Sequence, residues 1–376
     1  MLSMRLPFKR SYRTLNTVHV SAEALKHNLN LYRTLFPGKA ICPVLKSNAY
    51  GHGLIEVAKV MDQERPEFLI VDSLYEAYKL ESADIKSKIL ILGYTFPENL
   101  SRKKVPFHFA VSDLESARVL AKQGAKVHLK IDTGMNRMGF GMDELPMVLP
   151  ELKALDLNVV GVLTHLADSD NPEDESYTQM QLSCFEEVVS LVRGAGFDPE
   201  WIHPGQSAGS LKAGEVGNMV RLGLGLYGIS PFEEGDPNGE ILSLLKPVME
   251  LESTIVGIRR LKAGDRVSYN GTFVAERAMM IGIVPVGYYE ALPRVFSGKG
   301  GMEVSGVMCP IVGRICMNYT MVDVTSVEGV TIGDSVMVFS RKRGAVNSMV
   351  ELAKKAGTIP YELMTRVAES VRREVH

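Results

Sequence analysis

The sequence of 376 residues has little of several features that mark large classes of protein. It has no run of about 18 apolar residues, so no membrane-spanning helix is expected. Its net charge of -2 gives no basic footprint for nucleic acid. Its four cysteines are scattered and form no CxxC pair, so we expect a reducing compartment, the cytoplasm, and predict no metal site.

The first 15 residues carry four basic side chains and no apolar segment, which predicts an N-terminal arm rather than a signal peptide. Beyond this arm, short apolar runs alternate regularly with helical patterns. The eight runs are residues 40–45, 68–71, 88–92, 108–111, 126–131, 158–165, 201–203 and 219–222. Helical patterns between them include 54–61, 74–81, 114–122 and 177–193. Eight alternating units predict buried parallel strands and a (β/α)8 TIM-type barrel.

The pattern changes after Pro231. Residues 233–239 are turn-rich and predict a linker. Strand-like runs come next at 249–258, 277–285, 302–309, 320–324 and 334–339, and helices are predicted at 348–356 and 361–375. We therefore predict an α/β fold in which residues 16–240 form the barrel and residues 241–376 form a mainly β C-terminal domain. Residues 17–20, before a helix capped by Ser21, are a further candidate for the β domain.

Polar residues follow several of the predicted barrel strands at their C-terminal ends, which form the active face of such barrels. They are Lys46 after the first strand, Lys130 and residues 132–139 at the fifth, His165 at the sixth, residues 203–209 after the seventh and residues 221–225 at the eighth. A single lysine at a strand end is more simply a solvated residue. Five polar clusters at one mouth predict a functional site.

The loops after the seventh and eighth strands are rich in glycine and carry Ser207, which is typical of phosphate sites in barrels. Residues 223–228 match GxGxxG, but Ile229-Ser230-Pro231 comes next instead of a helix, so we reject a dinucleotide site. A lysine and a phosphate site at one mouth predict pyridoxal phosphate, held by Lys46 as a Schiff base.

These segments together resemble the alanine racemase family. Residues 44–53 resemble its cofactor-lysine signature and residues 130–139 its second signature, while residues 221–228, 267–272 and 313–317 match further blocks in the same order. The resemblance covers roughly residues 16–376. It implies a barrel followed by a β domain, pyridoxal phosphate, alanine as substrate, D-alanine supplied for peptidoglycan, and a homodimer with shared active sites.

The resemblance also implies roles for individual residues. Lys46 and Tyr269, the latter from the partner subunit, would be two bases acting on opposite faces of the substrate Cα. The implied cofactor contacts, besides Lys46, are Tyr50, His165, Ser207, Arg221, Gly223, Leu224 and Tyr361. The implied substrate contacts are Arg137 and Met317, with Lys130 orienting Arg137 and Asn318 beside Met317, and His203 would support Arg221. The implied substrate path is lined by Asp170, Tyr288, Arg294, Arg314 and Ile359.

Arg221 would face the pyridine nitrogen of the cofactor. A carboxylate at this place would keep the nitrogen protonated, whereas an arginine is always charged and cannot play that part.

The sequence departs from the family pattern at several places. Asn318 stands where aspartate is common, and residues 287–291 replace a usual Gly-Tyr-Ala-Asp-Gly. Gln206 stands where asparagine is common and Ser47 where alanine is common. These departures concern substrate range and turnover, since both proposed bases are present.

Other functions remain open at this point. A racemase that acts on other amino acids, or on more of them, would use the same fold. Such relatives are often exported, and the N-terminal arm, which is not predicted to be a signal peptide, counts against this alternative. A decarboxylase is disfavoured because Arg137 and Met317 would retain the carboxylate. Non-catalytic cofactor-binding relatives consist of the barrel alone, whereas this chain continues into a β domain. A purely structural protein would leave the five polar clusters unexplained.

Overall fold

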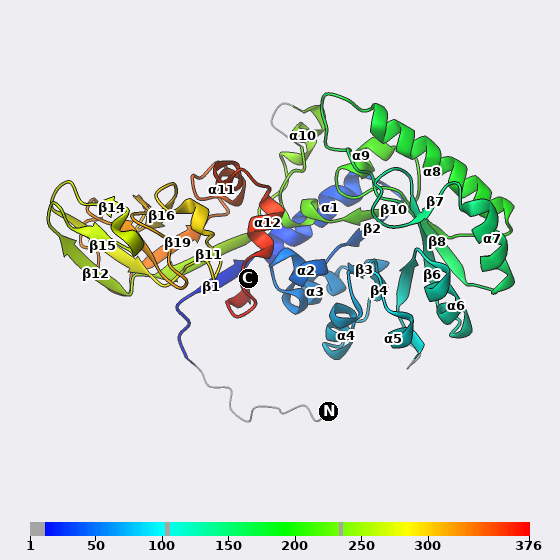
Figure 1. Cartoon of the computed structure of the whole chain (residues 1–376), viewed down its shortest axis with the longest axis horizontal. Helices are drawn as coiled ribbons and strands as arrows, with labels where there is room; N and C mark the ends of the chain where they lie inside the picture. Colours follow the sequence, from blue (N-terminus) through cyan, green and yellow to red (C-terminus); the bar gives the residue numbers. More distant parts are fainter. Residues whose placement is uncertain (1–11, 102–105, 233–235) are drawn as a thin grey trace. The chain divides into compact units, whose positions relative to one another are not determined.

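The computed structural model describes residues 12–101, 106–232 and 236–376. The chain divides into two compact units (Figure 1). Unit 1 is Met1–His19 with Glu250–Glu374, and unit 2 is Val20–Met249 with Val375–His376. In the described ranges, no helix is both long and apolar enough to cross a membrane. Residues 1–11 of the predicted arm and 233–235 of the predicted linker lie outside the described residues.

Unit 2 contains all eight predicted parallel strands. They are β2 (Ala40–Pro43), β3 (Phe68–Val71), β4 (Lys88–Ile91), β5 (His108–Val111), β6 (Val127–Asp132), β8 (Val159–Leu163), β9 (Trp201–His203) and β10 (Met219–Leu222). Neighbours run β3-β4-β5-β6-β8-β9, and β10 pairs with β2. A bridge between Val44 and Ile70 links the end of β2 to β3. The parallel sheet therefore curls into a barrel, as predicted, and a short β7 (Phe140–Gly141) pairs with β6.

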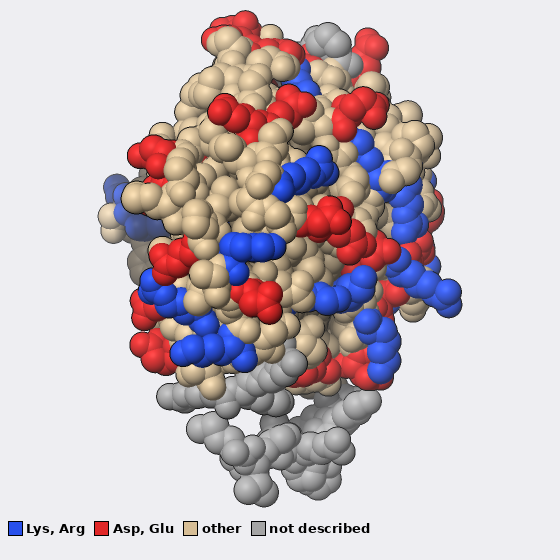
Figure 2. Space-filling model, turned by 90° about the vertical axis from the view of Figure 1, so that its right-hand side faces the viewer, with Lys and Arg blue, Asp and Glu red and all other residues tan. Residues whose placement is uncertain are grey.

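The helices of this unit alternate with these strands, and the longer ones cover the outside of the curled sheet (Figure 1). They are α1 (Ala22–Leu35), α2 (Lys46–Tyr50), α3 (Leu54–Gln63), α4 (Leu74–Ser82), α5 (Pro97–Ser101), α6 (Leu114–Lys122), α7 (Leu145–Ala154), α8 (Ser176–Gly194), α9 (Gly209–Ala213), η1 (Leu224–Tyr227) and α10 (Pro237–Leu242). Ser21 and Asp113 cap α1 and α6 by accepting from backbone N–H groups at 3.1 and 2.7 Å. On the face in Figure 2 both signs of charge are interspersed.

The predicted linker is partly wrong, because α10 begins inside it. Asp236 caps this helix by accepting from Asn238 N at 2.7 Å, and Pro237 occupies the first turn. Proline is favoured there because its missing N–H would have no partner within the helix. The turn-rich stretch therefore contains a helix start at Asp236 and Pro237.

Unit 1 is mainly β. Its strands are β1 (Thr17–Val20), β11 (Met249–Thr254), β12 (Gly257–Leu261), β13 (Arg266–Val267), β14 (Phe273–Val274), β15 (Met279–Val284), β16 (Gly301–Val304), β17 (Val307–Pro310), β18 (Thr320–Asp323), β19 (Ser335–Phe339) and β20 (Arg372–Val375). Among the described residues they form sheets ordered β17-β16-β19-β11-β1-β20, β12-β15-β18 and β13-β14. The remaining elements are η2 (Tyr269–Gly271), η3 (Arg294–Phe296), α11 (Met349–Ala356) and α12 (Pro360–Thr365).

Two predicted strands of this unit are each two strands. Residues 302–309 form the β16–β17 hairpin, because Ser305 and Gly306 adopt φ of 49° and 81° and turn the chain back. Residues 249–258 form β11 and the start of β12, which belong to two different sheets. Ile255 N bonds Asp334 O, whereas Val256 N bonds Ile283 O in the other sheet.

The predicted helix over residues 361–375 is wrong beyond its first turns. Helix α12 ends at Thr365, and residues 372–375 form β20. The guanidinium of Arg373 donates to the carbonyl oxygens of Val367 and Ala368 at 3.0 and 2.6 Å. These carbonyls are therefore satisfied by a side chain instead of by continuing helix, and the chain turns into the strand.

Candidate active site

Lys46 lies just after β2, where the backbone becomes left-handed. Ser47, Asn48, Ala49 and Tyr50 have φ of 56°, 56°, 52° and 52°. The left-handed conformation costs an L-residue roughly 1–2 kcal/mol. Four such residues in a row persist only if other contacts hold them, and strain of this kind concentrates at functional sites.

A buried carboxylate holds this turn. Glu76 in the first turn of α4 is 8% exposed, and its two oxygens accept from Asn48 N at 3.1 Å and Asp72 N at 3.0 Å. Asn48 Oδ1 accepts from Leu54 N at 2.8 Å. Hydrogen bonds to a charged group contribute about 1.5–3 kcal/mol each, enough to offset much of the backbone cost. Glu76 was not predicted as a site residue, because it follows the helix cap Ser73 by three residues and so matches an ordinary capping box.

Small residues and hydroxyls meet at the ends of β9 and β10. Ser207, 2% exposed, accepts from Gly223 N at 3.0 Å and from Gly225 N at 3.2 Å. Because its oxygen accepts both bonds, its hydroxyl hydrogen can be donated to an anion. A Cβ on Gly223 would lie 2.9 Å from Tyr50 Oη, so glycine lets the tyrosine hydroxyl approach the loop. The predicted phosphate ligands Tyr50, Ser207, Gly223 and Leu224 therefore lie together in unit 2, whereas Tyr361 belongs to unit 1.

Arg221 on β10 is buried, with 2% of its surface exposed. Its Nη2 donates to the carbonyl oxygens of Thr164 at 2.6 Å and Pro204 at 3.2 Å, and its Nη1 donates to His203 O and to His203 Nδ1. Within the described ranges no carboxylate pairs with it. Burial lowers the pKa of Arg221 to about 9, so the group is still charged at neutral pH.

A chain of three buried imidazoles extends from Arg221 through the barrel core. A guanidinium only donates, so the His203 Nδ1 that faces it at 3.2 Å accepts and the proton of this ring lies on Nε2. His203 Nε2 donates to His128 Nδ1 at 2.8 Å, and His128 Nε2 donates to His108 Nδ1 at 3.1 Å. A Cβ on Gly161 would lie 2.2 Å from His128 Nδ1, so glycine makes room for this ring.

All three imidazoles are neutral, and their acceptor nitrogens all point toward Arg221. Burial lowers the pKa of His203 and His128 well below the usual range and that of His108 to about 4. His203 was predicted to support Arg221, and the contact is present. His128 and His108 were missed, because nothing in strand sequence shows which of several histidines face one another inside a barrel.

The loop after β6 presents Arg137. Asp132 accepts from the backbone N–H of Gly134, Asn136 and Arg137 at 2.9, 3.0 and 2.8 Å, which also lowers the pKa of this carboxyl despite its partial burial. An aspartate that closes a loop on its own following amides is a common turn device. Asp132 thus shapes the loop and leaves Arg137 exposed beside the strand ends.

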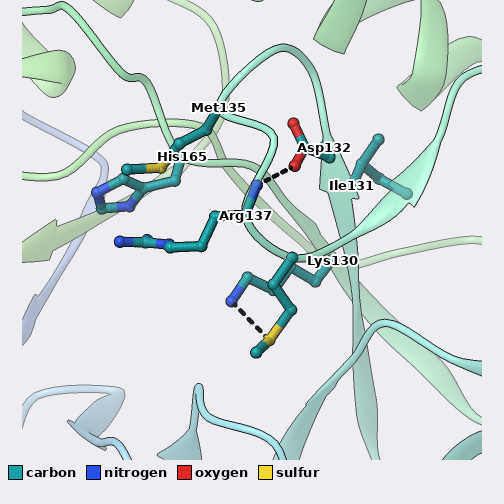
Figure 3. Close-up of a pocket in the computed structure, with 7 residues that line it drawn as sticks. Lys130, Ile131, Asp132, Met135, Arg137 and His165 are labelled. Carbon is teal, nitrogen blue, oxygen red and sulfur yellow. Dashed lines mark hydrogen bonds between the residues drawn. The ribbon is translucent and has the colours of Figure 1, made fainter.

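Lys130, Arg137 and His165 line one pocket with Ile131, Asp132, Met135 and Met138. Figure 3 shows the His165 ring and the Arg137 guanidinium directed to the same side, away from Ile131. Lys130 Nζ contacts Met138 Sδ at 3.4 Å and Leu92 O at 3.5 Å. Burial, followed by Arg137, Arg221 and Lys46, lowers the pKa of Lys130 to about 8.

The charge at this mouth tests whether pyridoxal phosphate fits. Burial is the main cause that lowers the pKa of His165 to about 3, and Arg221, Arg137, Lys46 and Lys130 each add to the effect. Four cations therefore act on one ring. A phosphate and a phenolate oxygen are the anions that such a field attracts, and the Tyr50 and Ser207 hydroxyls lie among the same strand ends. The residues present fit the cofactor.

Tyr269 lies in unit 1, at the start of η2 between β13 and β14. Its side chain is 64% exposed. The preceding Ser268 has φ of 64°, and its hydroxyl donates to Arg314 O at 2.6 Å and lies 3.5 Å from Cys316 Sγ. The contacts of Ser268 with Arg314 and Cys316 thus fix the backbone next to Tyr269.

The other predicted residues divide between the two units. Arg314, Met317 and Asn318 follow β17 in unit 1, where Tyr288, Arg294, Ile359 and Tyr361 also lie. Met317, Tyr288 and Ile359 are 55%, 46% and 59% exposed. Asp170 is exposed in unit 2, in the segment between β8 and α8.

Comparisons with known proteins cover both units. Residues 20–231 match the family model "Alanine racemase, N-terminal domain", and residues 248–375 match "Alanine racemase, C-terminal domain". The chain is 36% identical over 370 residues to an alanine racemase of Geobacter sulfurreducens, covering 94% of this chain and 95% of that protein. It is 35% identical over 375 residues to one of Leptospira interrogans, covering 95% of each.

Solved structures agree. An alanine racemase from Bacillus anthracis with bound L-Ala-P has a TM-score of 0.88 at 30% identity, covering 97% of this chain and 96% of that chain. One from the D-cycloserine producer Streptomyces lavendulae has a TM-score of 0.87 at 27% identity, covering 97% and 98%. The chain therefore belongs to the alanine racemase family, whose members are pyridoxal-phosphate-dependent isomerases.

Proposed function

We propose that this chain interconverts L-alanine and D-alanine by a two-base mechanism, with pyridoxal phosphate held on Lys46, and supplies D-alanine for peptidoglycan from the cytoplasm. The observation that carries the proposal is the setting of Lys46. It stands on a strained turn at the strand ends, in one cationic cluster with Lys130, Arg137 and Arg221. Family membership supports alanine as the substrate.

The cofactor would be held at both ends. Lys46 would bind it covalently, while Tyr50, Ser207 and the backbone at Gly223 and Leu224 would bind its phosphate, with Tyr361 as a further ligand. The Ser207 hydroxyl is already oriented by two backbone N–H groups. When bound, pyridoxal phosphate supplies the electron sink that stabilises negative charge on the substrate Cα.

Arg221 would face the pyridine nitrogen. Its pKa of about 9 and its hydrogen bonds to three carbonyl oxygens favour a charged guanidinium that donates and never accepts. A group of this kind would not supply a proton-accepting partner to that nitrogen, which would limit how far negative charge spreads from Cα and would suit racemisation.

Two bases are needed because one proton leaves one face of Cα and another arrives at the opposite face. Lys46 would serve one face, and Tyr269 of the partner subunit would serve the other. The 64% exposure of the Tyr269 side chain supports a homodimer, since a base working in a water-poor site must be covered by something beyond its own unit. His165, neutral because its pKa lies at about 3, would pack beside the cofactor ring without adding another cation.

The substrate carboxylate would be bound by Arg137 and by the backbone N–H of Met317. Arg137 is directed by the Asp132 loop, and its guanidinium can bind a carboxylate through two donors. As its carbamate, which is an anion, Lys130 would orient Arg137. The exposed residues Asp170, Tyr288, Arg294 and Ile359, with the half-buried Arg314, would line the path by which alanine arrives.

Purified protein incubated separately with L-alanine, L-serine and L-lysine tests this proposal through the chirality of each product. Alanine should racemise fastest. Lys46→Ala should lose both the cofactor absorbance and all turnover. Faster racemisation of serine or lysine would replace the substrate assignment, and full activity of Lys46→Ala would overturn the role of that lysine.

A further inference from the structure

Two loops of unit 1 meet backbone to backbone, residues 287–290 after β15 and residues 316–319 before β18. Tyr288 N donates to Cys316 O at 3.1 Å, and Tyr289 N donates to Met317 O at 3.0 Å. A Cβ on Gly287 would lie 2.3 Å from both of these carbonyl oxygens. Glycine is therefore required for the approach, and the position of one loop sets that of the other.

A single carboxylate joins the two loops. Glu290 Oε2 accepts from Gly287 N at 2.8 Å, within its own loop. Its Oε1 accepts from Asn318 Nδ2 at 2.6 Å, in the other. The backbone of Glu290 is also fixed, because its carbonyl oxygen accepts from Ala368 N at 2.9 Å. Both side chains are partly buried, so water replaces their mutual hydrogen bond less readily than at an open surface.

The chemistry of this contact depends on residue 318 being an amide. The Asn318 side chain has donors, whereas an ionised aspartate only accepts and would face Glu290 as a like charge. Asparagine is one of the departures from the family pattern noted in the sequence, and Glu290 lies in another. The structure joins these two departures in one hydrogen bond.

Met317 lies immediately before Asn318 in the turn that this contact joins to the other loop. Its side chain is 55% exposed, so little packing holds it. The turn that carries it is closed by Cys316 N donating to Tyr319 O at 2.9 Å and by the bond from Tyr289 N. Rotation of this turn would redirect the Met317 N–H, and the Asn318–Glu290 bond opposes that rotation.

We propose that Glu290 and Asn318 are a coupled pair of positioning residues that aim the Met317 N–H at the substrate carboxylate. The inference rests on the proposed function, in which Met317 contacts that carboxylate. It predicts a specific exchange rule for this chain: as long as residue 290 is the glutamate that reaches residue 318, residue 318 must donate. Restoring the aspartate common in the family, at position 318 alone, should therefore harm this protein.

The test compares Asn318→Asp, Glu290→Gln and the double variant as holoenzymes. In the double variant the new glutamine side chain at position 290 would donate to the new carboxylate at position 318 and still accept from Gly287 N, so the connection re-forms with the charge exchanged. Each protein is assayed for kcat and KM with alanine and for inhibition by propionate, which is alanine without its amino group. Cofactor absorbance and thermal unfolding are recorded for all. Asn99→Asp, the same change at an exposed position of α5, is the matched control.

Asn318→Asp should raise KM for alanine and the inhibition constant of propionate together by about tenfold, equivalent to about 1.4 kcal/mol of binding, and should change kcat far less. The double variant should return both constants to within about threefold of wild type. If Asn318→Asp proves too unstable to assay, an active double variant still supports the pairing. The pairing is refuted if Asn318→Asp binds both ligands normally, or if the double variant is as impaired as Asn318→Asp. Absence of alanine racemisation by the wild type in the same assay would instead refute the proposed function.

Discussion

Replacing His108 by asparagine separates the structural role of the buried imidazole chain from its response to acid. His108 accepts from His128 Nε2 through Nδ1, and it is 7% exposed. An asparagine Oδ1 occupies nearly the position of Nδ1, so His108→Asn keeps the acceptor and removes the titrating group. His108→Leu removes both and leaves the His128 N–H without an acceptor, which costs about 1–3 kcal/mol.

The magnitude is set by the pKa of His108, which burial lowers to about 4 from an unfolded value of about 6.5. Between these values the unfolded chain binds a proton that the folded chain does not, so stability is lost as pH falls from 6.5 toward 4. At pH 5 this one residue costs about 2 kcal/mol, whereas at pH 7 it costs about 0.2 kcal/mol.

Urea unfolding of the holoenzyme at pH 7, 6 and 5 measures the effect. The wild type should lose about 2 kcal/mol more than His108→Asn between pH 7 and pH 5. His108→Leu should already be destabilised at pH 7. Equal losses on acidification for the wild type and His108→Asn would refute the assignment of His108 as a neutral member of the chain.

Three further changes probe the strand ends. Glu76→Ala removes the acceptor of Asn48 N, so it should destabilise the turn by about 1.5–3 kcal/mol and weaken cofactor retention in dialysis. Glu76→Gln should have smaller effects of the same kind. Equal cofactor retention by Glu76→Ala and the wild type would contradict this prediction. Gly223→Ala places a methyl group 2.9 Å from Tyr50 Oη. It should weaken cofactor binding by about tenfold in titrations that follow absorbance. Unchanged cofactor affinity would exclude this loop as the phosphate site. Lys130, whose pKa is lowered to about 8, should form a carbamate with ¹³C-bicarbonate as the neutral amine appears through pH 8; the signal should be missing from Lys130→Arg, and its persistence there would assign it elsewhere.

The barrel was predictable because parallel strands are buried on both faces and appear as continuous apolar runs. All four residues of β3 are buried, and its run is unmistakable in the sequence. Helix caps were equally readable, since Ser21 and Asp113 act through local hydrogen bonds within three residues. Prediction failed where a distant contact decides the local conformation, as at residues 366–375, where the Arg373 side chain satisfies carbonyl groups that a helix would otherwise use.

The same distinction holds for the site. The strand-end positions of Lys46, Arg221 and His203 could be predicted because these residues adjoin glycine-rich or polar segments. Glu76, His128 and the Glu290–Asn318 contact could not, because each acts through a partner 20 or more residues away: His128 meets His203 across 75 positions, and Glu290 meets Asn318 across 28. The proposed role of Tyr269 came from resemblance alone, since no pattern within one chain predicts a base supplied to its partner.

Hydrogen exchange at the substrate Cα tests the two-base claim most directly. Wild type and Tyr269→Phe are incubated separately with L-alanine and with D-alanine in deuterated water, and deuterium uptake and chirality are followed together. With two bases, the wild type should exchange and invert both enantiomers, whereas Tyr269→Phe should keep its cofactor, exchange one enantiomer through Lys46 and invert neither. Inversion of both enantiomers by Tyr269→Phe at the wild-type rate would contradict the two-base claim.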